Sequence, residues 1–145
     1  MNAQNLSFSR ALVTGGAGFI GSHLVDALME RGLEVTVIDN LSSGRLSNIS
    51  SWLKNPRLKF IMGDMLNLDD VRRALEGCDI AFHLAANPDV KVGAFNTKID
   101  YEQNIFATRN LLEAMRESKT CMSIIFTSTS TVYGCLLYTS DAADE

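Results

Sequence analysis

Three glycines near the start of the chain have the spacing of a phosphate-binding turn. Gly15, Gly18 and Gly21 recur at every third position in TGGAGFIGSHL. Glycine has no Cβ, so its backbone can lie directly against a pyrophosphate, and the free N–H groups of a following helix can bind the phosphate oxygens. Glycine also serves ordinary tight turns, so this spacing does not by itself establish a nucleotide site.

Asp39 supplies a second observation. It lies 24 residues after Gly15, directly after the apolar, β-branched run EVTVI. At the carboxyl end of a second strand, a carboxylate can accept hydrogen bonds from both hydroxyls of an adenine ribose. The glycines and Asp39 together therefore predict a dinucleotide-binding site.

The charge of Asp39 also bears on which dinucleotide binds. A 2′-phosphate about 5 Å from this carboxylate would cost on the order of 3 kcal/mol per unit charge at an effective dielectric near 20. This energy corresponds to roughly a hundredfold preference for NAD over NADP. Arg45 could reduce the preference by reaching the phosphate. We expect NAD as the cofactor.

Strands and helices are predicted to alternate along the chain, which is typical of a parallel sheet covered by helices. The chain of 145 residues is long enough for about one such α/β domain. The predicted strands are Arg10–Thr14, Glu34–Ile38, Leu58–Met62, Ile80–Leu84 and Ser123–Thr127.

Two of the predicted helices have start or stop signals. Phe19–Arg31 is followed by Gly32, a residue that commonly ends helices from the position after the last turn. A shorter helix is capped by Asn67 or Asp69, runs to Leu75 and stops at Gly77.

Two further segments are predicted with less regular patterns. In Asp100–Glu117 an amphipathic helix is expected, with an apolar face formed by Ile105, Leu112 and Met115 and with Leu111 beside them. Residues 41–56 are expected to form a polar loop with a helical turn around 49–53.

Composition excludes several classes of function. The net charge of -4, with both signs interspersed, disfavours binding to nucleic acid or to an anionic membrane. No apolar run approaches the roughly 18 residues of a membrane span, and the first ten residues lack the apolar core of a signal peptide.

Cysteine and histidine usage bears on the cellular compartment and on metal binding. Cys78, Cys121 and Cys135 are scattered without a C-x-x-C spacing, which disfavours a disulfide framework and favours a reducing compartment. His23 and His83 have no second ligand at metal spacing, so packed or capping roles are expected and no metal site is predicted. We expect a cytoplasmic protein.

Six motifs in this order and spacing resemble the N-terminal half of an extended short-chain dehydrogenase/reductase. They are TGGAGFIGSHL, VIDNLSSGR, GDMLN, FHLAANPDV, NIFATRNLLEAM and STSTVYG. Within the epimerase/dehydratase group they are most similar to NAD-dependent nucleotide-sugar epimerases of the UDP-glucose 4-epimerase type, particularly archaeal-like members. The resemblance implies a Rossmann-type doubly wound sheet with strand order 3-2-1-4-5, a UDP-sugar substrate and a homodimer.

The resemblance also implies a set of cofactor contacts. The pyrophosphate is bound by Gly15, Gly18, Phe19, Ile20 and Gly21, and the adenosine ribose by Asp39, Asn40, Leu41, Ser42, Ser43 and Gly44. The adenine is bordered by Asp64 and Met65, the nicotinamide half by Leu84, Ala85 and Ala86, and Asn104 supports the cofactor from the following helix. Asp64 has an ordinary alternative role, because it could simply cap a turn.

Thr129 is the catalytic candidate that the resemblance implies. It lies four residues before the tyrosine of V-Y-G, where the family binds the reacting sugar hydroxyl. Related dehydratases carry Asp-Glu next, whereas this chain has Ser130 and Thr131, which cannot act as acid and base near neutrality. Related decarboxylases usually keep a Glu at the second of these positions and are also disfavoured.

The end of the chain departs from the family pattern. The family base is a later tyrosine in Y-x-x-x-K, but Tyr138 is followed by Ala142 at that spacing, and Tyr133 is structural in the family. We therefore expect residues 1–134 to be a truncated NAD-binding domain without activity of its own, lacking the later strands and the substrate domain, and 135–145 to be a foreign tail. Nucleotide-sugar dehydratases, reductases and a non-catalytic NAD-binding module remain the alternative hypotheses.

Overall fold

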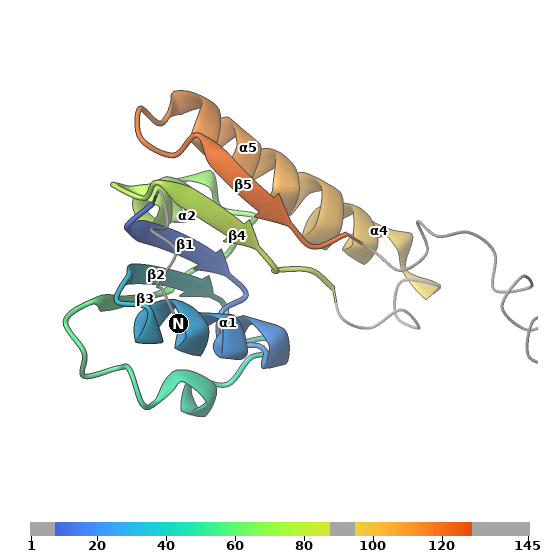
Figure 1. The fold of residues 1–145 in the computed structure, drawn as a ribbon. Helices are drawn as coiled ribbons and strands as arrows, with labels where there is room; N and C mark the ends of the chain where they lie inside the picture. The colour runs from blue at the N-terminus through green and yellow to red at the C-terminus, as the bar shows by residue number, and fades with distance from the viewer. Residues whose placement is uncertain (1–7, 88–94, 129–145) are drawn as a thin grey trace, which may run out of the picture.

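The computed structural model describes residues 8–87 and 95–128, which form a five-stranded parallel sheet in the order β3-β2-β1-β4-β5 (Figure 1). The strands are β1 (Arg10–Thr14), β2 (Glu34–Asp39), β3 (Leu58–Met62), β4 (Ile80–His83) and β5 (Ser123–Phe126). The predicted strands and their order are confirmed. Only ends differ: β2 extends through Asp39, and β4 and β5 each end one residue earlier than predicted.

The centre of the sheet is apolar because β1 has neighbours on both sides. Val13 lies in register with Val37 of β2 and with Phe82 of β4. From β1 the chain moves first toward β3 and then returns to the other side with β4, so the loops after β1 and β4 diverge at one edge. This topological switch point is where doubly wound sheets bind ligands.

Helices cover both faces of the sheet (Figure 1). One face packs against α1 (Phe19–Glu30) through Val25, Leu28 and Met29. The other packs against α2 (Leu68–Leu75) and α5 (Ala107–Glu117). None of the described helices is long and apolar enough to cross a membrane.

The predicted helix signals operate as expected. Asn67 caps α2, because its Oδ1 accepts from Asp69 N at 3.0 Å. Gly32 and Gly77 follow α1 and α2 with φ of 88° and 74°, conformations that favour glycine. Cys78 and Cys121 are free and buried, while Cys135 and the predicted tail lie outside the described residues.

The helix predicted over Asp100–Glu117 is longer and less regular than expected. It comprises α4 (Thr97–Asp100), a π-helical segment η2 (Tyr101–Phe106) and α5. The predicted apolar face is wrong for Ile105 and Leu112, which are 61% and 50% exposed. A π segment places more residues in a turn, so a face projected at a period of 3.6 shifts as it crosses η2.

The face of α5 that is buried consists mostly of small residues. Ala107, Leu111 and Ala114 pack in the core against α2 and the sheet, with Met115 partly buried beside them. Two of these residues are alanines. A search for apolar periodicity that gives more weight to larger side chains overlooks alanine.

The helical turn in the loop after β2 is also displaced from its predicted position. It begins earlier, as the 3₁₀ segment η1 (Leu46–Ile49), and hydrogen-bonded turns continue it, with Trp52 N donating to Ile49 O at 3.0 Å. The loop is held against the glycine turn, because Arg45 N and Asn48 Nδ2 both donate to Ala17 O, at 2.9 and 2.8 Å. Ile49 is fully buried beneath it.

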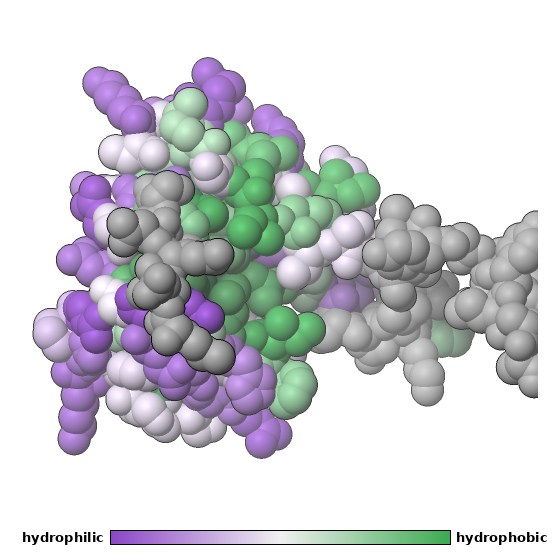
Figure 2. Space-filling model, viewed as in Figure 1, coloured by the Kyte–Doolittle hydropathy of each residue, from purple (hydrophilic) through white to green (hydrophobic). Residues whose placement is uncertain are grey.

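The edge strand β5 exposes apolar side chains. Ile125 and Phe126 are 52% and 54% exposed. Figure 2 shows hydrophobic side chains gathered on the part of the surface where β4 and β5 lie in Figure 1.

Candidate functional site

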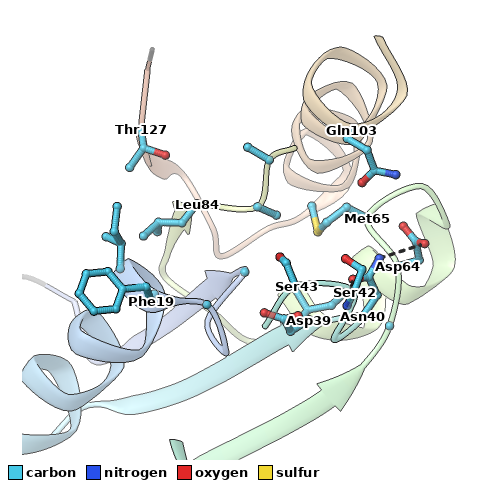
Figure 3. Close-up of a pocket in the computed structure, with 18 residues that line it drawn as sticks. Phe19, Asp39, Asn40, Ser42, Ser43, Asp64, Met65, Leu84, Gln103 and Thr127 are labelled. Carbon is cyan, nitrogen blue, oxygen red and sulfur yellow. Dashed lines mark hydrogen bonds between the residues drawn. The ribbon is translucent and has the colours of Figure 1, made fainter. Parts of the chain in front are cut away.

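A cavity of about 430 Å³ opens at the carboxyl edge of the sheet, a size typical of small-molecule sites (Figure 3). Leu84 and Thr127 lie at one end, and Asp39, Asn40 and Asp64 at the other (Figure 3). Its lining residues are Gly15, Gly18, Phe19, Ile20, Gly21, Ile38, Asp39, Asn40, Ser42, Ser43, Gly63, Asp64, Met65, Leu84, Ala85, Ala86, Gln103 and Thr127.

The glycine turn is packed too tightly for side chains. Gly15 has φ 68°, and its N–H donates to Ile38 O at 2.9 Å. A Cβ on Gly21 would lie 2.2 Å from Gly15 O, and one on Gly18 would lie 3.1 Å from the same atom. These contacts explain why this segment requires glycine.

The start of α1 faces the cavity without a competing side chain. Gly18 is the N-cap residue and forms no side-chain cap, and the first turn contains no acidic residue. The first N–H groups of a helix have no intrahelical acceptors and carry partial positive charge. Because no lysine or arginine of the described chain lines the cavity, these N–H groups are the natural partners for phosphate oxygens.

Asp39 connects the glycine turn to the loop after β2. Its Oδ2 accepts from Ala17 N at 2.9 Å, and its Oδ1 accepts from Leu41 N at 2.8 Å. An ionised carboxylate has about four acceptor positions, so both oxygens keep capacity for ribose hydroxyls. A Cβ on Gly44 would lie 3.0 Å from each oxygen, and its absence leaves space beside the carboxylate.

Asp64 lies at the edge of the cavity and also has the ordinary turn-capping role considered for it. It lines the cavity, and its Oδ1 also accepts from Leu66 N at 2.9 Å in a local turn. Its Oδ2 accepts from Asn40 Nδ2 at 3.4 Å, the bond drawn in Figure 3. The loops after β2 and β3 are thereby joined at this end of the cavity.

Asn110 is a functional candidate that sequence reasoning missed. It is 2% exposed on α5, and its Nδ2 donates to Met65 O at 2.9 Å and to Leu66 O at 3.0 Å. These carbonyls belong to the loop bordering the cavity, so α5 holds that loop in place. An asparagine within a predicted amphipathic helix is a weak signal, because such helices carry polar residues on their exposed face.

The opposite end of the cavity is held by threonines. Thr14 Oγ1 accepts from Leu84 N at 3.1 Å and from Ala85 N at 3.0 Å. Thr127 lines the cavity after β5, and its N and Oγ1 both donate to His83 O, at 3.2 and 3.0 Å. Its position at the carboxyl end of a strand was a signal that could have identified it.

Most of the residues predicted for the cofactor site come together around the cavity, with three exceptions. Leu41 and Gly44 contact Asp39 without lining the cavity, and Asn104 lines another groove, although its Oδ1 accepts from Asn87 N, the residue after Ala86, at 3.0 Å. Ile38, Gly63, Gln103 and Thr127 line the cavity without having been predicted. The proposed catalytic Thr129 lies outside the described residues.

The cavity has the groups that a dinucleotide requires, with backbone N–H groups between a carboxylate able to accept from ribose hydroxyls and an apolar end. The family described as GDP-mannose 4,6 dehydratase matches residues 12–143. The chain belongs to this family. Family membership and the strand order confirm the predicted resemblance to NAD-dependent epimerases and dehydratases.

Members of the family with different reactions are similar to the chain. It is 37% identical over 130 residues to a CDP-paratose 2-epimerase of Salmonella typhi, covering 88% of this chain and 38% of the relative. It is 38% identical over 125 residues to a UDP-N-acetyl-alpha-D-glucosaminuronate decarboxylase of Bacillus cytotoxicus, covering 86% of this chain and 38% of the relative. Overall identity therefore does not separate the family's reactions.

A solved structure extends the comparison. The UDP-glucose 4-epimerase of Thermus thermophilus in complex with NAD has a TM-score of 0.74 and 40% identity, covering 83% of this chain and 37% of that one. The chain thus spans less than two fifths of the length of these family members.

Proposed function

We propose that this chain is the NAD-binding part of a nucleotide-sugar epimerase of the UDP-glucose 4-epimerase type. The observation that carries the proposal is Asp39, which lies 9% exposed at the end of β2 and is hydrogen-bonded to Ala17 N of the glycine turn that leads into α1. The adenosine ribose binds at Asp39, the pyrophosphate at the glycine turn, and the nicotinamide half beside Leu84–Ala86. The N–H groups of α1 neutralise the diphosphate.

NAD rather than NADP is the proposed cofactor. This proposal is supported by the absence of lysine and arginine, Arg45 included, from the cavity lining in the described part of the chain. The test is titration of the chain with NAD and NADP, before and after Asp39→Ala. We expect wild type to prefer NAD by about a hundredfold and the variant to narrow that ratio.

The ratio of the NAD affinity to the NADP affinity separates the effect of the Asp39 charge from the effect of Asp39 on the local structure. Asp39→Ala also removes the acceptor of Ala17 N and Leu41 N, which weakens both ligands alike. Asp69→Ala, at an 85% exposed carboxylate, is the control and should leave both affinities unchanged. Equal affinity of the wild-type chain for NAD and NADP would contradict the proposal.

The reaction is proposed for a protein of the relatives' full length that contains this chain. Bound NAD would accept a hydride from the sugar and return it to the other face. Thr129 would orient the reacting hydroxyl. Ser130 and Thr131 favour epimerisation over elimination or decarboxylation, because neither hydroxyl acts as acid or base near neutrality.

Product analysis tests this reaction. The full-length protein should interconvert two epimers of a UDP-sugar without accumulating NADH, and Thr129→Val should slow it by about 10² or more. Net NADH, a 4-keto-6-deoxy sugar or released CO₂ would assign a different reaction of the family.

A homodimer and a cytoplasmic location are proposed with it. The outer face of the η2–α5 helix exposes Ile105 and Leu112 beside Arg109 and Glu113, a mixed surface on which two copies could pair their opposite charges. Leu112→Glu should convert a dimer of the full-length protein to a monomer in light scattering. An unchanged mass would place the contact elsewhere.

A further inference from the structure

A line of hydrogen bonds crosses the molecule beneath the apolar end of the cavity. Thr14 Oγ1 lies 2.7 Å from His83 Nδ1, and His83 Nε2 lies 2.9 Å from Thr108 Oγ1. Thr108 Oγ1 in turn donates to Asn104 O at 2.5 Å. The line joins β1, β4 and the helix formed by η2 and α5.

The direction of each bond follows from the donors available. Thr14 Oγ1 already accepts from Leu84 N and Ala85 N, so its own proton goes to His83 Nδ1. His83 Nε2 therefore carries the ring proton and donates to Thr108. Thr108 Oγ1 accepts this hydrogen bond and donates its own to Asn104 O.

Burial keeps the ring of His83 neutral. The residue is 1% exposed, and burial lowers its pKa to about 4. A protonated ring would have to donate to both threonines, and Thr14 Oγ1 could not accept from Nδ1 without losing one of its backbone donors.

The line ends on backbone that borders the cavity. Leu84 and Ala85 are held through Thr14, and Thr127 is held by the carbonyl of His83. A Cβ on Gly15 would lie 2.9 Å from Ala85 N, so the segment after β4 also packs directly against the glycine turn. A small movement of this segment would change the shape of the cavity.

We propose that His83, as the neutral Nε2–H tautomer, is a positioning residue that holds Leu84–Ala86 in place for the nicotinamide half of the cofactor, using Thr108 as its anchor on α5. This inference rests on the proposed NAD site. An ordinary packing role would stabilise the whole domain equally, whereas a positioning role acts on one half of the ligand.

The first test is made on the unmodified chain. Long-range ¹H–¹⁵N NMR distinguishes the two neutral tautomers of a histidine, and exposed His23 is the only other histidine signal. We expect His83 as the Nε2–H form at pH 7. A protonated ring or the Nδ1–H form would overturn the proposal.

The second test compares two ligands. ADP-ribose lacks the nicotinamide ring, so calorimetric titration with NAD and ADP-ribose separates the two ends of the site. Thr108→Val removes the anchor at nearly constant volume and should weaken NAD about fivefold or more while changing ADP-ribose less than twofold. Thr108→Ser should restore the wild-type ratio, and Thr120→Val, at an exposed and remote threonine, should not change it.

The possible outcomes separate the inference from the proposed function. Equal weakening of both ligands by Thr108→Val, or no weakening of either, would overturn the positioning role while leaving the NAD site intact. Failure of the wild-type chain to bind either ligand would overturn the proposed function and the positioning role with it.

Discussion

Helix α1 borders the candidate site directly and helix α5 holds segments that border it, and the two helices shape the site in opposite ways. The α1 side contributes backbone: a Cβ on Gly21 would meet Gly15 O at 2.2 Å, and Gly18 forms no side-chain cap. The α5 side contributes side chains: Asn110 holds the loop after β3, and Thr108 holds His83.

This difference predicts two kinds of sensitivity. The α1 side should tolerate no added atoms, because its close contacts are between backbone groups that cannot move apart cheaply. The α5 side should tolerate no lost donors, because its polar groups are buried and paired. Variants on each side test the distinction.

Gly21→Ala should have the largest effect. The added methyl group meets backbone atoms, so we expect a loss of at least about 4 kcal/mol of unfolding free energy, or no folded protein, in chemical denaturation. Gly32→Ala is the control: its Cβ meets only the Arg57 side chain at 3.4 Å, and its φ of 88° should cost about 1 kcal/mol. Similar losses of unfolding free energy in both variants would show that the close contact between residue 21 and Gly15 O has no particular effect.

The next largest effect is expected from the protonation of His83, which should make the unfolding free energy depend on pH. Its folded pKa is lowered from 6.5 to about 4, so between these values the unfolded chain binds the additional proton. The stability is therefore fully present above pH 6.5 and falls by about 3 kcal/mol as the pH approaches 4. Denaturation at a series of pH values measures this slope.

Two matched variants test whether His83 causes this change of unfolding free energy with pH. His83→Gln should remove it in this pH range, whereas His23→Gln, on the exposed side of α1, should retain it. Persistence of the slope in His83→Gln would show that other groups produce it.

Asn110→Leu should cost about 2 kcal/mol, because Met65 O and Leu66 O lose their donor in a buried site. Adenosine monophosphate should also bind more weakly, since the affected loop borders the adenosine end. Asn110→Asp should be worse than Asn110→Leu, because it presents only acceptors to two carbonyls. The reverse order would mean that packing, and not donation, is the role of Asn110.

The smallest effect is expected from the exposed ion pair between α2 and α5. Arg72 Nε and Nη2 donate to Glu117 at 2.8 and 2.9 Å, and this hydrogen bonding lowers the pKa of Glu117. Both groups are solvated, so Arg72→Met should lower the melting temperature only slightly, and by less at about 0.5 M salt. A loss comparable to that of Asn110→Leu would erase the contrast between buried and exposed polar contacts on α5.

Much of the α1 side was predictable from sequence because its requirements are local. Gly15, Gly18 and Gly21 occupy one turn, and that turn closes on itself through Gly15 O. Asp39 is the last residue of a strand that periodicity identifies, and parallel strands bring their carboxyl ends to one edge. The strand positions followed from the same short-range patterns, and the strand order followed from the resemblance of the motifs.

The α5 side was decided by tertiary structure. Thr14 and His83 are 69 positions apart, and Asn110 lies 45 positions from Met65. No local pattern distinguishes these residues from ordinary polar residues in a strand or helix. The buried face of α5 was also mispredicted, because η2 shifts the helical phase and alanine packing depends on how closely α2 and the sheet approach. The steric requirements of a turn can be recognised from the types of adjacent residues. A hydrogen bond between distant segments forms only when the fold has brought its donor and acceptor together.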